Sequence, residues 1–367
     1  MPKDVIIMGG GLAGLTAAIQ LAQWGRSVQL FEKGHYPSHK VCGEYISNEV
    51  RPYLERLGVF PEIPLPQLNQ FFLSDIQGNS LQLDLPLGGF GISRYTLDHH
   101  LYQCAVSCGV EVFIHTSVQA LRMENDVFTI TTEEGAEHSS RYVVGAFGKR
   151  SLLDKFLQRP FMQKRSPYIG VKYHIRLPYP ENQIALHNFP MGYCGISRVE
   201  GESVNLCYLA SREALKPYKD IRKMEEALLF QNPHLKQIFE GAEFLWDKPL
   251  VINEVSFEAK EPVEGHVLMC GDSAGLITPL CGNGMAMAIH AAKLASEAIH
   301  QHFDDRQQVE QTYAKQWKSL FALRLWAGRN IQKLFGHHAA SRITVGAGKA
   351  MPFVAKKMIT LTHGSPF

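Results

Sequence analysis

The order of apolar and polar positions predicts a nucleotide-binding unit at the start of the chain. Val5 to Met8 is a short apolar run beside glycines, which is typical of a strand buried on both faces of a parallel sheet. The small and aliphatic residues from Leu12 to Trp24 predict a helix that ends at Gly25. Ser27 to Glu32 then predicts a second short strand, so the pattern is strand, glycine turn, helix and strand.

The rest of the chain alternates between two textures, by which we mean two patterns of apolar and polar residues. The nucleotide-domain texture predicts helices at Leu97 to Cys108 and Met285 to His300, and strands at Gly109 to Phe113, Phe128 to Thr132, Tyr142 to Ala146 and Val267 to Met269. Between residues 166 and 256 the pattern changes to alternating, β-rich segments such as Val204 to Leu209. That alternation is typical of an antiparallel sheet, which here would form a substrate wall.

A GxGxxG fingerprint, Gly9 to Gly14, lies between the first strand and the first helix. Gly9 permits the tight turn, Gly11 lets the backbone approach a pyrophosphate, and Gly14 lets the helix pack close to the strand. The free N–H groups and the positive end of the helix dipole can hold the diphosphate. Glu32 closes the second strand, where a carboxylate accepts the ribose hydroxyls and repels a 2′-phosphate. This site therefore favours FAD or NAD over NADP.

A second glycine-rich turn, Cys270 to Gly275, follows a later strand. Its Asp272 stands at a strand end, where it can accept hydrogen bonds from ribityl hydroxyls. The dipole of the helix that starts at Met285 would stabilise the negative charge of a reduced flavin ring. The residues that lead into this helix include Pro279, Gly282 and Gly284. Taken alone, the turn is also explained by a loop that caps an ordinary helix, but together the two motifs predict FAD.

Four segments resemble the FAD-dependent family with the p-hydroxybenzoate hydroxylase type of fold, and within it the geranylgeranyl reductase branch, whose relatives include flavin halogenases. The segments are the opening fingerprint, Lys40 to Glu44, Ser93 to Leu101 and Gly271 to Met285. Aromatic hydroxylases typically have His where this chain has Gly275, and Asn where it has Met287. The Trp-x-Trp-x-Ile-Pro signature of tryptophan-type halogenases is missing. The resemblance therefore implies a reductase and disfavours halogenation.

One departure from the family concerns the electron donor. The family often carries an Asp-Gly motif after the third strand of the nucleotide domain, where this chain has Phe147 and Gly148. That Asp is associated in the hydroxylases with positioning flavin and NAD(P)H. Its replacement argues against hydroxylase-style use of NADPH, and the sequence has only one dinucleotide fingerprint. The expected donor is therefore either NAD(P)H that docks transiently or a reduced electron carrier, such as a ferredoxin-like protein.

The two textures and the resemblance predict an α/β fold, with a Rossmann-type FAD-binding domain, an interleaved antiparallel β-sheet substrate domain and a C-terminal helical segment. We assign residues 1–75, 95–165 and 255–300 to the FAD-binding domain. The substrate domain takes residues 76–94 and 166–254, and the basic C-terminal helical segment takes residues 301–367.

The motifs and the resemblance together imply a set of site residues. The predicted cofactor-binding residues are Gly9, Gly11, Leu12, Ala13, Gly14, Glu32, Lys33, Cys42, Gly43, Arg94, Val118, Gly148, Gly271, Asp272, Pro279, Gly282, Gly284 and Met285. Arg94 is either a flavin contact or a surface ion-pair former, and Cys42 either lines the site or is a buried small hydrophobe. Cys42 and Tyr193 are the predicted catalytic residues, as proton donors, with Tyr208 as a third candidate. The sixteen histidines show no ligand spacing, so no metal is predicted.

Composition and the first residues limit the partners and the cellular compartment that we expect for the protein. A net charge of +2 over 367 residues gives no case for nucleic-acid binding. Seven scattered cysteines without a CxxC pair favour a reducing, cytoplasmic environment. The first residues run straight into a structural motif, which predicts no signal peptide. No apolar run approaches the roughly eighteen residues of a transmembrane helix.

The last part of the chain is basic. From Gln311 to Phe367 the sequence has nine Lys or Arg and no Asp or Glu. Its apolar residues recur at spacings of three and four, at Tyr313, Trp317, Leu320, Phe321, Leu325 and Trp326. Such a helix either packs its apolar stripe on the body or attaches to an anionic membrane surface. The segment after Gly336 shows no clear pattern.

The sequence therefore predicts an FAD-dependent oxidoreductase that reduces or dehydrogenates C=C bonds of a hydrophobic substrate, isoprenoid or polyunsaturated, by hydride transfer at flavin N5. Two alternatives stay open. One is a monooxygenase of the aromatic hydroxylase type that uses O2 at C4a, and the other is a flavin electron-transfer protein. The expected partners are the hydrophobic small molecule, an electron-donor protein and a peripheral membrane surface.

Overall fold

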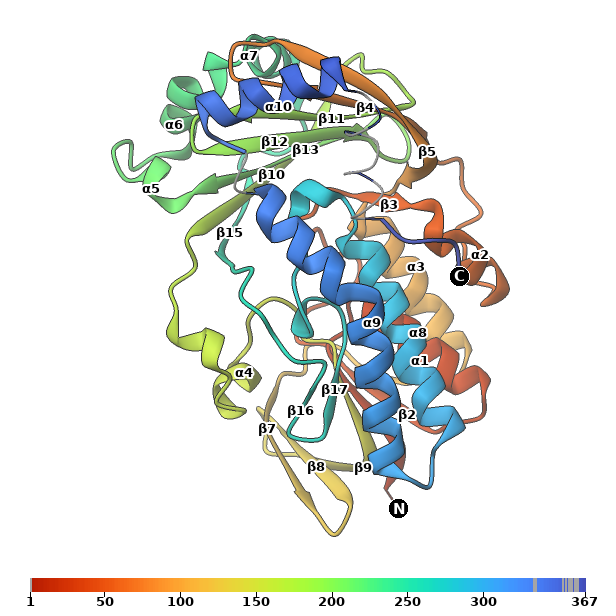
Figure 1. Cartoon of the computed structure of the whole chain (residues 1–367). Coiled ribbons are helices and arrows are strands. Elements are labelled where there is room, and N and C mark those ends of the chain that lie inside the picture. The colour runs from red at the N-terminus through yellow and green to blue at the C-terminus, as the bar shows by residue number, and fades with distance from the viewer. Residues whose placement is uncertain (1, 333–334, 352, 354, 356–358, 360–362) are drawn as a thin grey trace.

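Two β-sheets and the helices around them make up the molecule (Figure 1). The computed structural model describes residues 2–332, 335–351, 353, 355, 359 and 363–367. In the view of Figure 1, one sheet lies in the lower half and the other at the top, with the long helices α8 (Gly284–Gln301) and α9 (Arg306–Gln332) in front of the lower one. The α/β class that the sequence predicts is confirmed.

The lower sheet is built from short, apolar parallel strands. Its parallel members, in spatial order, are β17 (Val267–Met269), β9 (Glu137–Gly145), β1 (Lys3–Met8), β2 (Val28–Phe31) and β6 (Glu111–Phe113). The antiparallel additions are β16 (Val263–Glu264), β7 (Val118–Glu124) and β8 (Val127–Thr132). Because β1 and β17 run parallel on either side of β9, the two glycine turns that follow them emerge at the same edge of the sheet.

Helices α1 (Leu12–Gln23), α3 (Arg94–Ser107) and α8 pack side by side against this sheet, and α9 packs on α8. The start of α1 agrees with the prediction, and the helix ends at Trp24 and Gly25, where Gly25 adopts a φ of +77° that suits glycine. The stripe of α9 packs as the packing interpretation expects, since Tyr313, Trp317 and Phe321 are buried. Trp326, predicted in the same stripe, is instead 59% exposed.

The upper sheet is mainly antiparallel. In spatial order its strands are β14 (Glu243–Phe244), β10 (Tyr168–Arg176), β13 (Val204–Ser211), β12 (Gly192–Arg198), β11 (Gln183–Phe189), β4 (Gln67–Ser74), β5 (Ser80–Gly91) and β3 (Tyr45–Ser47), with β15 (Leu250–Val255) also paired to β10. The boundary expected between residues 75 and 76 falls inside the hairpin that β4 and β5 form. Strand β4 also pairs in parallel with β11, so it belongs to the upper sheet. An alternating pattern predicts a strand but does not identify its partner.

Shorter helices fill the edges of the two halves. They are α2 (Arg51–Arg56), α4 (Leu152–Phe156), α5 (Arg212–Leu215), α6 (Ile221–Leu228) and α7 (Pro233–Gly241), with 3-10 turns η1 (Asn48–Val50), η2 (Pro160–Gln163), η3 (Leu229–Gln231), η4 (Gly271–Ser273) and η5 (Pro279–Cys281). After Gly336, where the sequence shows no pattern, the chain forms a further helix, α10 (His338–Ala350). Among the described helices, none combines the length and apolar character needed to cross a membrane.

A buried arginine ties the lower half to the second glycine turn. Arg159 is 2% exposed, and its Nη1 lies 2.8 Å from Asp154 Oδ1 and 2.9 Å from the Ser273 carbonyl oxygen. Its Nε also lies 2.5 Å from Glu264 Oε2. A guanidinium in such a dry place needs its carboxylate partners, because an unpaired buried charge is strongly destabilising.

Asp154→Asn should therefore lower the free energy of unfolding by about 3 kcal/mol, because the variant leaves the Arg159 charge in the interior with one carboxylate fewer. Urea unfolding measures the change. The matched control is Glu137→Gln, which removes the carboxylate of an exposed pair with Arg122 and should change stability little. Equal effects of the two substitutions would contradict the importance of the buried pair.

Candidate functional site

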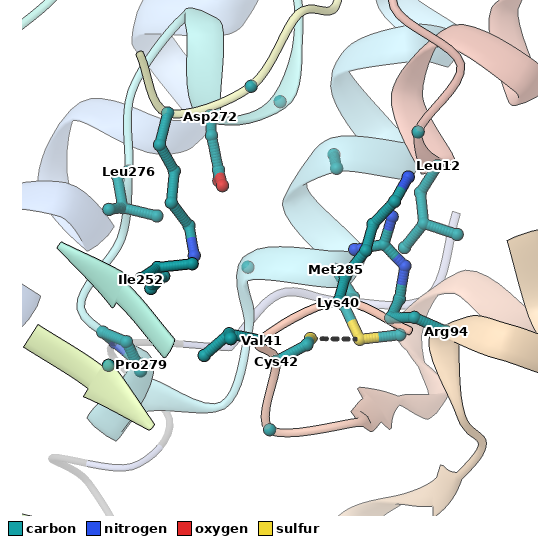
Figure 2. A pocket seen from close by; sticks show the side chains of 18 of the residues that line it. Leu12, Lys40, Val41, Cys42, Arg94, Ile252, Asp272, Leu276, Pro279 and Met285 are labelled. Atoms are coloured by element: carbon teal, nitrogen blue, oxygen red, sulfur yellow. Dashed lines mark hydrogen bonds between the residues drawn. The ribbon is translucent and has the colours of Figure 1, made fainter. Parts of the chain in front are cut away.

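The two glycine turns and the upper sheet enclose one cavity of about 660 Å³ (Figure 2). This volume falls in the range of roughly 300–1,000 Å³ that is common for ligand and cofactor sites. In Figure 2, Leu12, Arg94 and Met285 lie on one side of the cavity, and Ile252 and Leu276 lie on the other. The lining therefore comes from both halves of the molecule.

The glycines of the first turn each have a distinct role. Gly9 has a φ of +105°, and a Cβ there would lie 2.4 Å from the Ala146 carbonyl oxygen. A Cβ on Gly14 would lie 1.9 Å from the Gly9 carbonyl oxygen, so Gly14 serves the close packing of α1 on the turn and does not line the cavity. Gly11 has an ordinary φ of −86°, and its missing Cβ leaves open space toward Arg94, 3.6 Å away.

Glu32 is bonded to the backbone of this turn. Its Oε2 accepts from the Gly10 N–H at 2.7 Å and its Oε1 accepts from the Gly34 N–H at 2.8 Å. The Tyr36 hydroxyl donates to the Gly10 carbonyl oxygen at 2.5 Å. Each carboxylate oxygen can accept a second hydrogen bond, and Glu32 lines the cavity. The residue can therefore shape the turn and still accept a ribose hydroxyl.

Two helix N-termini meet at the cavity without a side-chain cap. The N-cap residues Gly11 of α1 and Asn283 of α8 make no side-chain cap hydrogen bond to their helices. The first residues of both helices, Leu12 and Ala13 in α1 and Gly284 and Met285 in α8, line the cavity. Unsatisfied N–H groups and the positive dipole ends attract anions. The arrangement fits FAD, and a pyrophosphate at α1 with the electron-rich edge of the ring at α8 stays a prediction.

The second turn is held from behind by basic side chains. Lys260 donates from Nζ to the Asp272 carbonyl oxygen at 2.7 Å and to the Lys149 carbonyl oxygen at 3.0 Å. Burial lowers the pKa of Lys260 to about 8. The Gly148 N–H donates to Ser273 Oγ at 2.9 Å. These contacts fix the backbone around Asp272, whose side chain borders the cavity.

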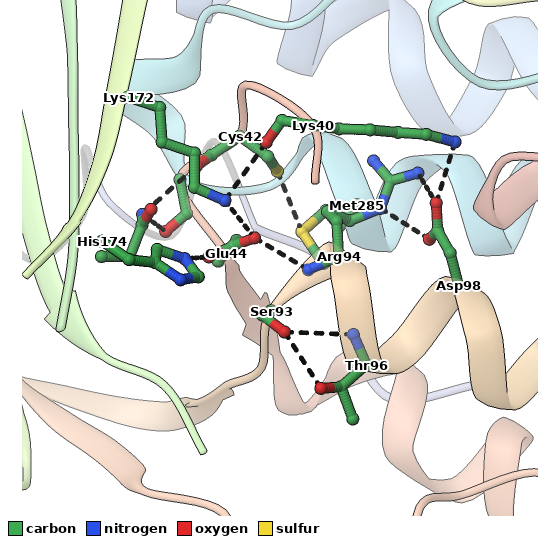
Figure 3. Close-up of polar contacts among 12 residues, drawn as sticks. Lys40, Cys42, Glu44, Ser93, Arg94, Thr96, Asp98, Lys172, His174 and Met285 are labelled. Carbon is green, nitrogen blue, oxygen red and sulfur yellow. Dashed lines mark hydrogen bonds and ion pairs between the residues drawn. The ribbon is translucent and has the colours of Figure 1, made fainter. Parts of the chain in front are cut away.

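Arg94 is an ion-paired residue, but it is not a surface one. Its Nε and Nη2 each lie 2.7 Å from one oxygen of Asp98, which is fully buried and also lies 3.0 Å from Lys40 Nζ (Figure 3). Burial alone would raise the pKa of Asp98, but the Arg94 charge outweighs it and holds the pKa below its ordinary value. Arg94 also lines the cavity. Arg94 therefore forms its ion pair at the cavity wall and not on the surface, and its contact with flavin stays a prediction.

Glu44 is the centre of a buried polar cluster that joins the two halves (Figure 3). It is 0% exposed and has a φ of +54°. Its Oε1 accepts from the Arg94 N–H at 2.8 Å and contacts the Lys172 ammonium, while Oε2 lies 2.6 Å from His174 Nε2. Burial alone would raise the pKa of Glu44, but the hydrogen bond from His174 and the Lys172 charge hold it below its ordinary value.

The sequence analysis missed Lys172 and His174. The two residues are two positions apart on β10, so their side chains reach the same face of the upper sheet. Basic residues alternate along the end of this strand, at Lys172, His174 and Arg176, and this spacing is the signal that could have identified the first two. Lys172 is fully buried and also donates to the Lys40 carbonyl oxygen at 3.2 Å.

This cluster fixes the loop that carries Cys42. Asn205 Nδ2 donates to the carbonyl oxygens of Cys42 and Gly43 at 3.2 and 2.8 Å, and so attaches the same loop to β13. Cys42 Sγ lies 3.3 Å from Met285 Sδ at the start of α8 and lines the cavity. The site interpretation of Cys42 therefore fits its position better than a purely structural one.

Tyr193 and Tyr208 differ in what their hydroxyls contact. Tyr193 is 2% exposed, lines the cavity, and its hydroxyl oxygen accepts from the Leu280 N–H at 2.8 Å. Burial raises the pKa of Tyr193 well above its ordinary value, so the hydroxyl keeps its proton. The Tyr208 hydroxyl instead donates to Glu225 Oε1 at 2.7 Å, and burial raises the pKa of Glu225 to about 7. Tyr208 also lines the cavity, but its proton is engaged by Glu225, which does not.

All the predicted cofactor-binding residues except Gly14 line this cavity, including Lys33, Gly43, Val118, Gly148, Gly271, Pro279 and Gly282. The remaining wall comes from the upper sheet and the turn after η4, and its side chains are largely aliphatic. They include Ile184, Leu186, Ile196, Leu209, Val251, Ile252 and Leu276. Contact of these residues with a cofactor or a substrate stays a prediction.

Comparison with known proteins gives one family match over most of the chain. The model of the FAD binding domain family matches residues 3–315. Conditioned medium factor receptor 1 of Dictyostelium discoideum is 24% identical over 360 residues, which cover 87% of this chain and 68% of that protein. The menaquinone reductase of Mycobacterium tuberculosis is 22% identical over 361 residues, which cover 90% and 82%. Digeranylgeranylglycerophospholipid reductase 1 of Methanosphaera stadtmanae is 24% identical over 345 residues, which cover 86% and 80%.

Among solved structures, the flavin-dependent brominase Bmp2 is similar with a TM-score of 0.77 and 20% sequence identity. The match covers 99% of this chain and 93% of that one. At this identity the likeness shows a shared fold and carries no argument about the reaction.

Gly11→Val should weaken FAD binding by roughly 10- to 100-fold, because the added side chain fills the space between the turn and Arg94. Isothermal titration of the cofactor-free protein with FAD measures the dissociation constant. The control is Gly346→Val in α10, where a Cβ meets nothing within 4 Å. If Gly11→Val binds FAD as tightly as the unmodified protein, the cofactor does not approach this turn.

Glu44→Gln should lower the free energy of unfolding at neutral pH by about 3 kcal/mol, because it leaves the buried Lys172 charge without its carboxylate. A carboxylate with a lowered pKa contributes stability above its ordinary pKa of 4.5, and that stability is lost as the pH falls through the folded-state value. The gap between the two proteins should therefore narrow on acidification. Urea unfolding over a pH series tests this, with Glu55→Gln of the exposed Arg51 pair as control. A gap that is constant with pH would exclude this origin.

Proposed function

The chain belongs to the FAD binding domain family, and within this family of FAD-dependent oxidoreductases we propose that it reduces C=C bonds of a hydrophobic, isoprenoid or polyunsaturated substrate. The observation that supports the proposal is the composition of the cavity described above. One side carries the two glycine turns and the uncapped helix ends, and the other side is largely aliphatic. A wall of this kind desolvates and binds a hydrocarbon chain, at about 25 cal/mol for each Å² of apolar surface buried.

The relatives add a second, weaker argument. Two of them are named as reductases, one of menaquinone and one of a digeranylgeranyl phospholipid, and the latter name states an isoprenoid substrate. At 22–24% identity these names suggest a substrate class and do not establish it.

The electron and proton balance of the proposed reaction is simple. The two glycine turns, with Glu32 and Asp272, would hold FAD, and the reduced cofactor would supply hydride-transfer chemistry for one alkene carbon. The second alkene carbon then needs one proton, which the protein or water delivers. NAD(P)H or a reduced electron carrier returns two electrons to the cofactor after each turnover.

Two side chains are suited to that proton transfer. The Tyr193 hydroxyl accepts its hydrogen bond from Leu280 and so keeps its own hydrogen free to donate, and its raised pKa keeps that hydrogen in place. Cys42 lies on the fixed loop opposite Met285. The aliphatic wall excludes water, which favours transfer from one of these groups.

The first test is an anaerobic one. The purified protein is reduced with dithionite, NADPH or NADH, and a short polyprenyl substrate is added while the flavin absorbance near ~450 nm is followed. Reoxidation without O2, with formation of the saturated product, is expected. If the flavin stays reduced until air enters, the monooxygenase becomes the favoured function, and if only a partner protein reoxidises it, electron transfer does.

Tyr193→Phe should slow substrate-dependent reoxidation by roughly 10²- to 10⁴-fold if Tyr193 is the donor, while reduction of the flavin by dithionite stays unchanged. Tyr208→Phe is the matched control, because it removes a buried hydroxyl that is engaged on Glu225. A loss of rate in Cys42→Ala with full rate in Tyr193→Phe would assign the proton to the thiol. Full rates in both variants would exclude the two residues as donors.

A further inference from the structure

The C-terminal helices carry an unusual number of exposed apolar side chains. Of the fourteen large hydrophobic residues that are exposed among the described residues, five lie between positions 323 and 353 and a sixth lies on the turn beside them. We call these six the C-terminal face. They are Met191 (43% exposed), Leu323 (58%), Trp326 (59%), Ile343 (68%), Met351 (53%) and Phe353 (78%).

These residues belong to elements that are fastened together. Gly336, between α9 and α10, accepts from the Met191 N–H at 2.8 Å on the β11–β12 turn, and its own N–H donates to Asn188 Oδ1 at 3.2 Å. Figure 1 shows α9 and α10, both in blue, on the same side of the molecule, with α10 across the upper sheet. The connection between the two helices is therefore attached to the upper sheet.

The segment that carries most of this face has charges of one sign in its own sequence. The sequence from 311 to 367 holds nine Lys or Arg and no Asp or Glu. Arg342 and Lys349 are exposed on α10 beside Ile343, while Lys318 on α9 is 2.8 Å from Glu261 and is thereby paired. Bulky apolar side chains beside exposed basic ones are typical of a surface that lies on anionic lipid, because the apolar groups enter the headgroup region and the cations meet lipid phosphates.

The inner side of the same segment reaches the aliphatic side of the cavity. Val345 of α10 is 1% exposed and belongs to the apolar cluster that contains Leu186, Tyr193 and Leu276, all of which line the cavity. The Phe335 ring lies edge-on to the Tyr193 ring, with 5.5 Å between centroids. The segment therefore packs its inner residues behind part of the cavity lining and exposes apolar residues on its outer side.

We propose that the C-terminal face docks the protein on an anionic lipid bilayer, and that the substrate enters from the lipid phase past this segment. The docking part stands on the exposed surface and its charge alone. The entry part rests on the proposed function, because it requires a substrate that dissolves in the bilayer.

A membrane is a better occupant than a second copy of the chain or an acidic electron carrier. The residues Trp326 and Phe353 are each more than half exposed, and Trp favours the membrane interface. A second copy would bring the same basic residues against each other, which costs free energy. A carrier would explain the basic residues but not six exposed hydrophobic side chains.

The test is co-sedimentation of the full-length, FAD-loaded protein with vesicles of phosphatidylcholine alone and with vesicles that also contain phosphatidylglycerol. Binding to the anionic vesicles is expected, and the paired substitution Leu323→Ser with Trp326→Ser should weaken it by at least about tenfold. Leu152→Ser on α4 is the matched control, because Leu152 is also 58% exposed but carries no part of the C-terminal face. Charge reversal by Arg342→Glu should weaken binding by a further factor of roughly 10 to 30, since each charge near the surface contributes about fivefold.

Three results would overturn the proposal. They are absence of binding to anionic vesicles, an equal loss in Leu152→Ser, or light scattering that shows a stable dimer which Leu323→Ser with Trp326→Ser converts to monomer. Turnover separates this proposal from the reductase function. A protein that binds vesicles but does not reduce a detergent-dispersed polyprenyl chain keeps the docking surface and loses the function. A protein that reduces the dispersed chain but ignores vesicles keeps the function and loses the docking surface.

Discussion

The site depends on the parallel pairing of β1, β9 and β17. Parallel strands end at one edge of a sheet, so the turns after Met8 and Met269 come together although about 260 residues separate them. Each turn leads into a helix whose first N–H groups lack a side-chain cap. The close approach at Gly14, where a Cβ would lie 1.9 Å from the Gly9 oxygen, fixes the direction of α1. A larger residue there would move a helix end that the cavity requires.

Holding the upper sheet against this edge takes a different kind of interaction. The Glu44 carboxylate is fully buried with Lys172 and His174 of β10, and such a cluster is a poor source of net stability because its charges give up their hydration. Its contribution is positional. It links the loop of Cys42, the first residue of α3 and the upper sheet at one carboxylate, and so fixes the distance between the glycine turns and the aliphatic wall. Apolar packing alone would permit sliding between these elements.

What the sequence could predict was local. Each glycine turn can be recognised from residues that are adjacent in the chain. Nearly all the residues predicted from these motifs line the cavity. Lys172 and His174 were not predicted as site residues, because their role depends on contacts with Glu44, which lies 128 and 130 residues away in the chain. The pairing of β4 with β11 could not be predicted for the same reason, since an alternating pattern identifies a strand and not its neighbour. Only one side of helix α10 packs on the body, so few of its residues are large and apolar. Its pattern of apolar and polar residues therefore predicts the helix weakly.

The C-terminal segment extends beyond the family match at residue 315, yet it completes the apolar cluster beside the cavity. The family fold supplies the turns and the two sheets, which are suited to many reactions on a flavin. Phe335 and α10 pack behind part of the aliphatic wall, next to Tyr193 and Leu276. Because α10 has a buried and an exposed side, a movement of α10 on its outer contacts would also disturb the apolar cluster that contains Leu186, Tyr193 and Leu276 of the cavity lining. Docking and substrate entry would in that case be a single conformational event.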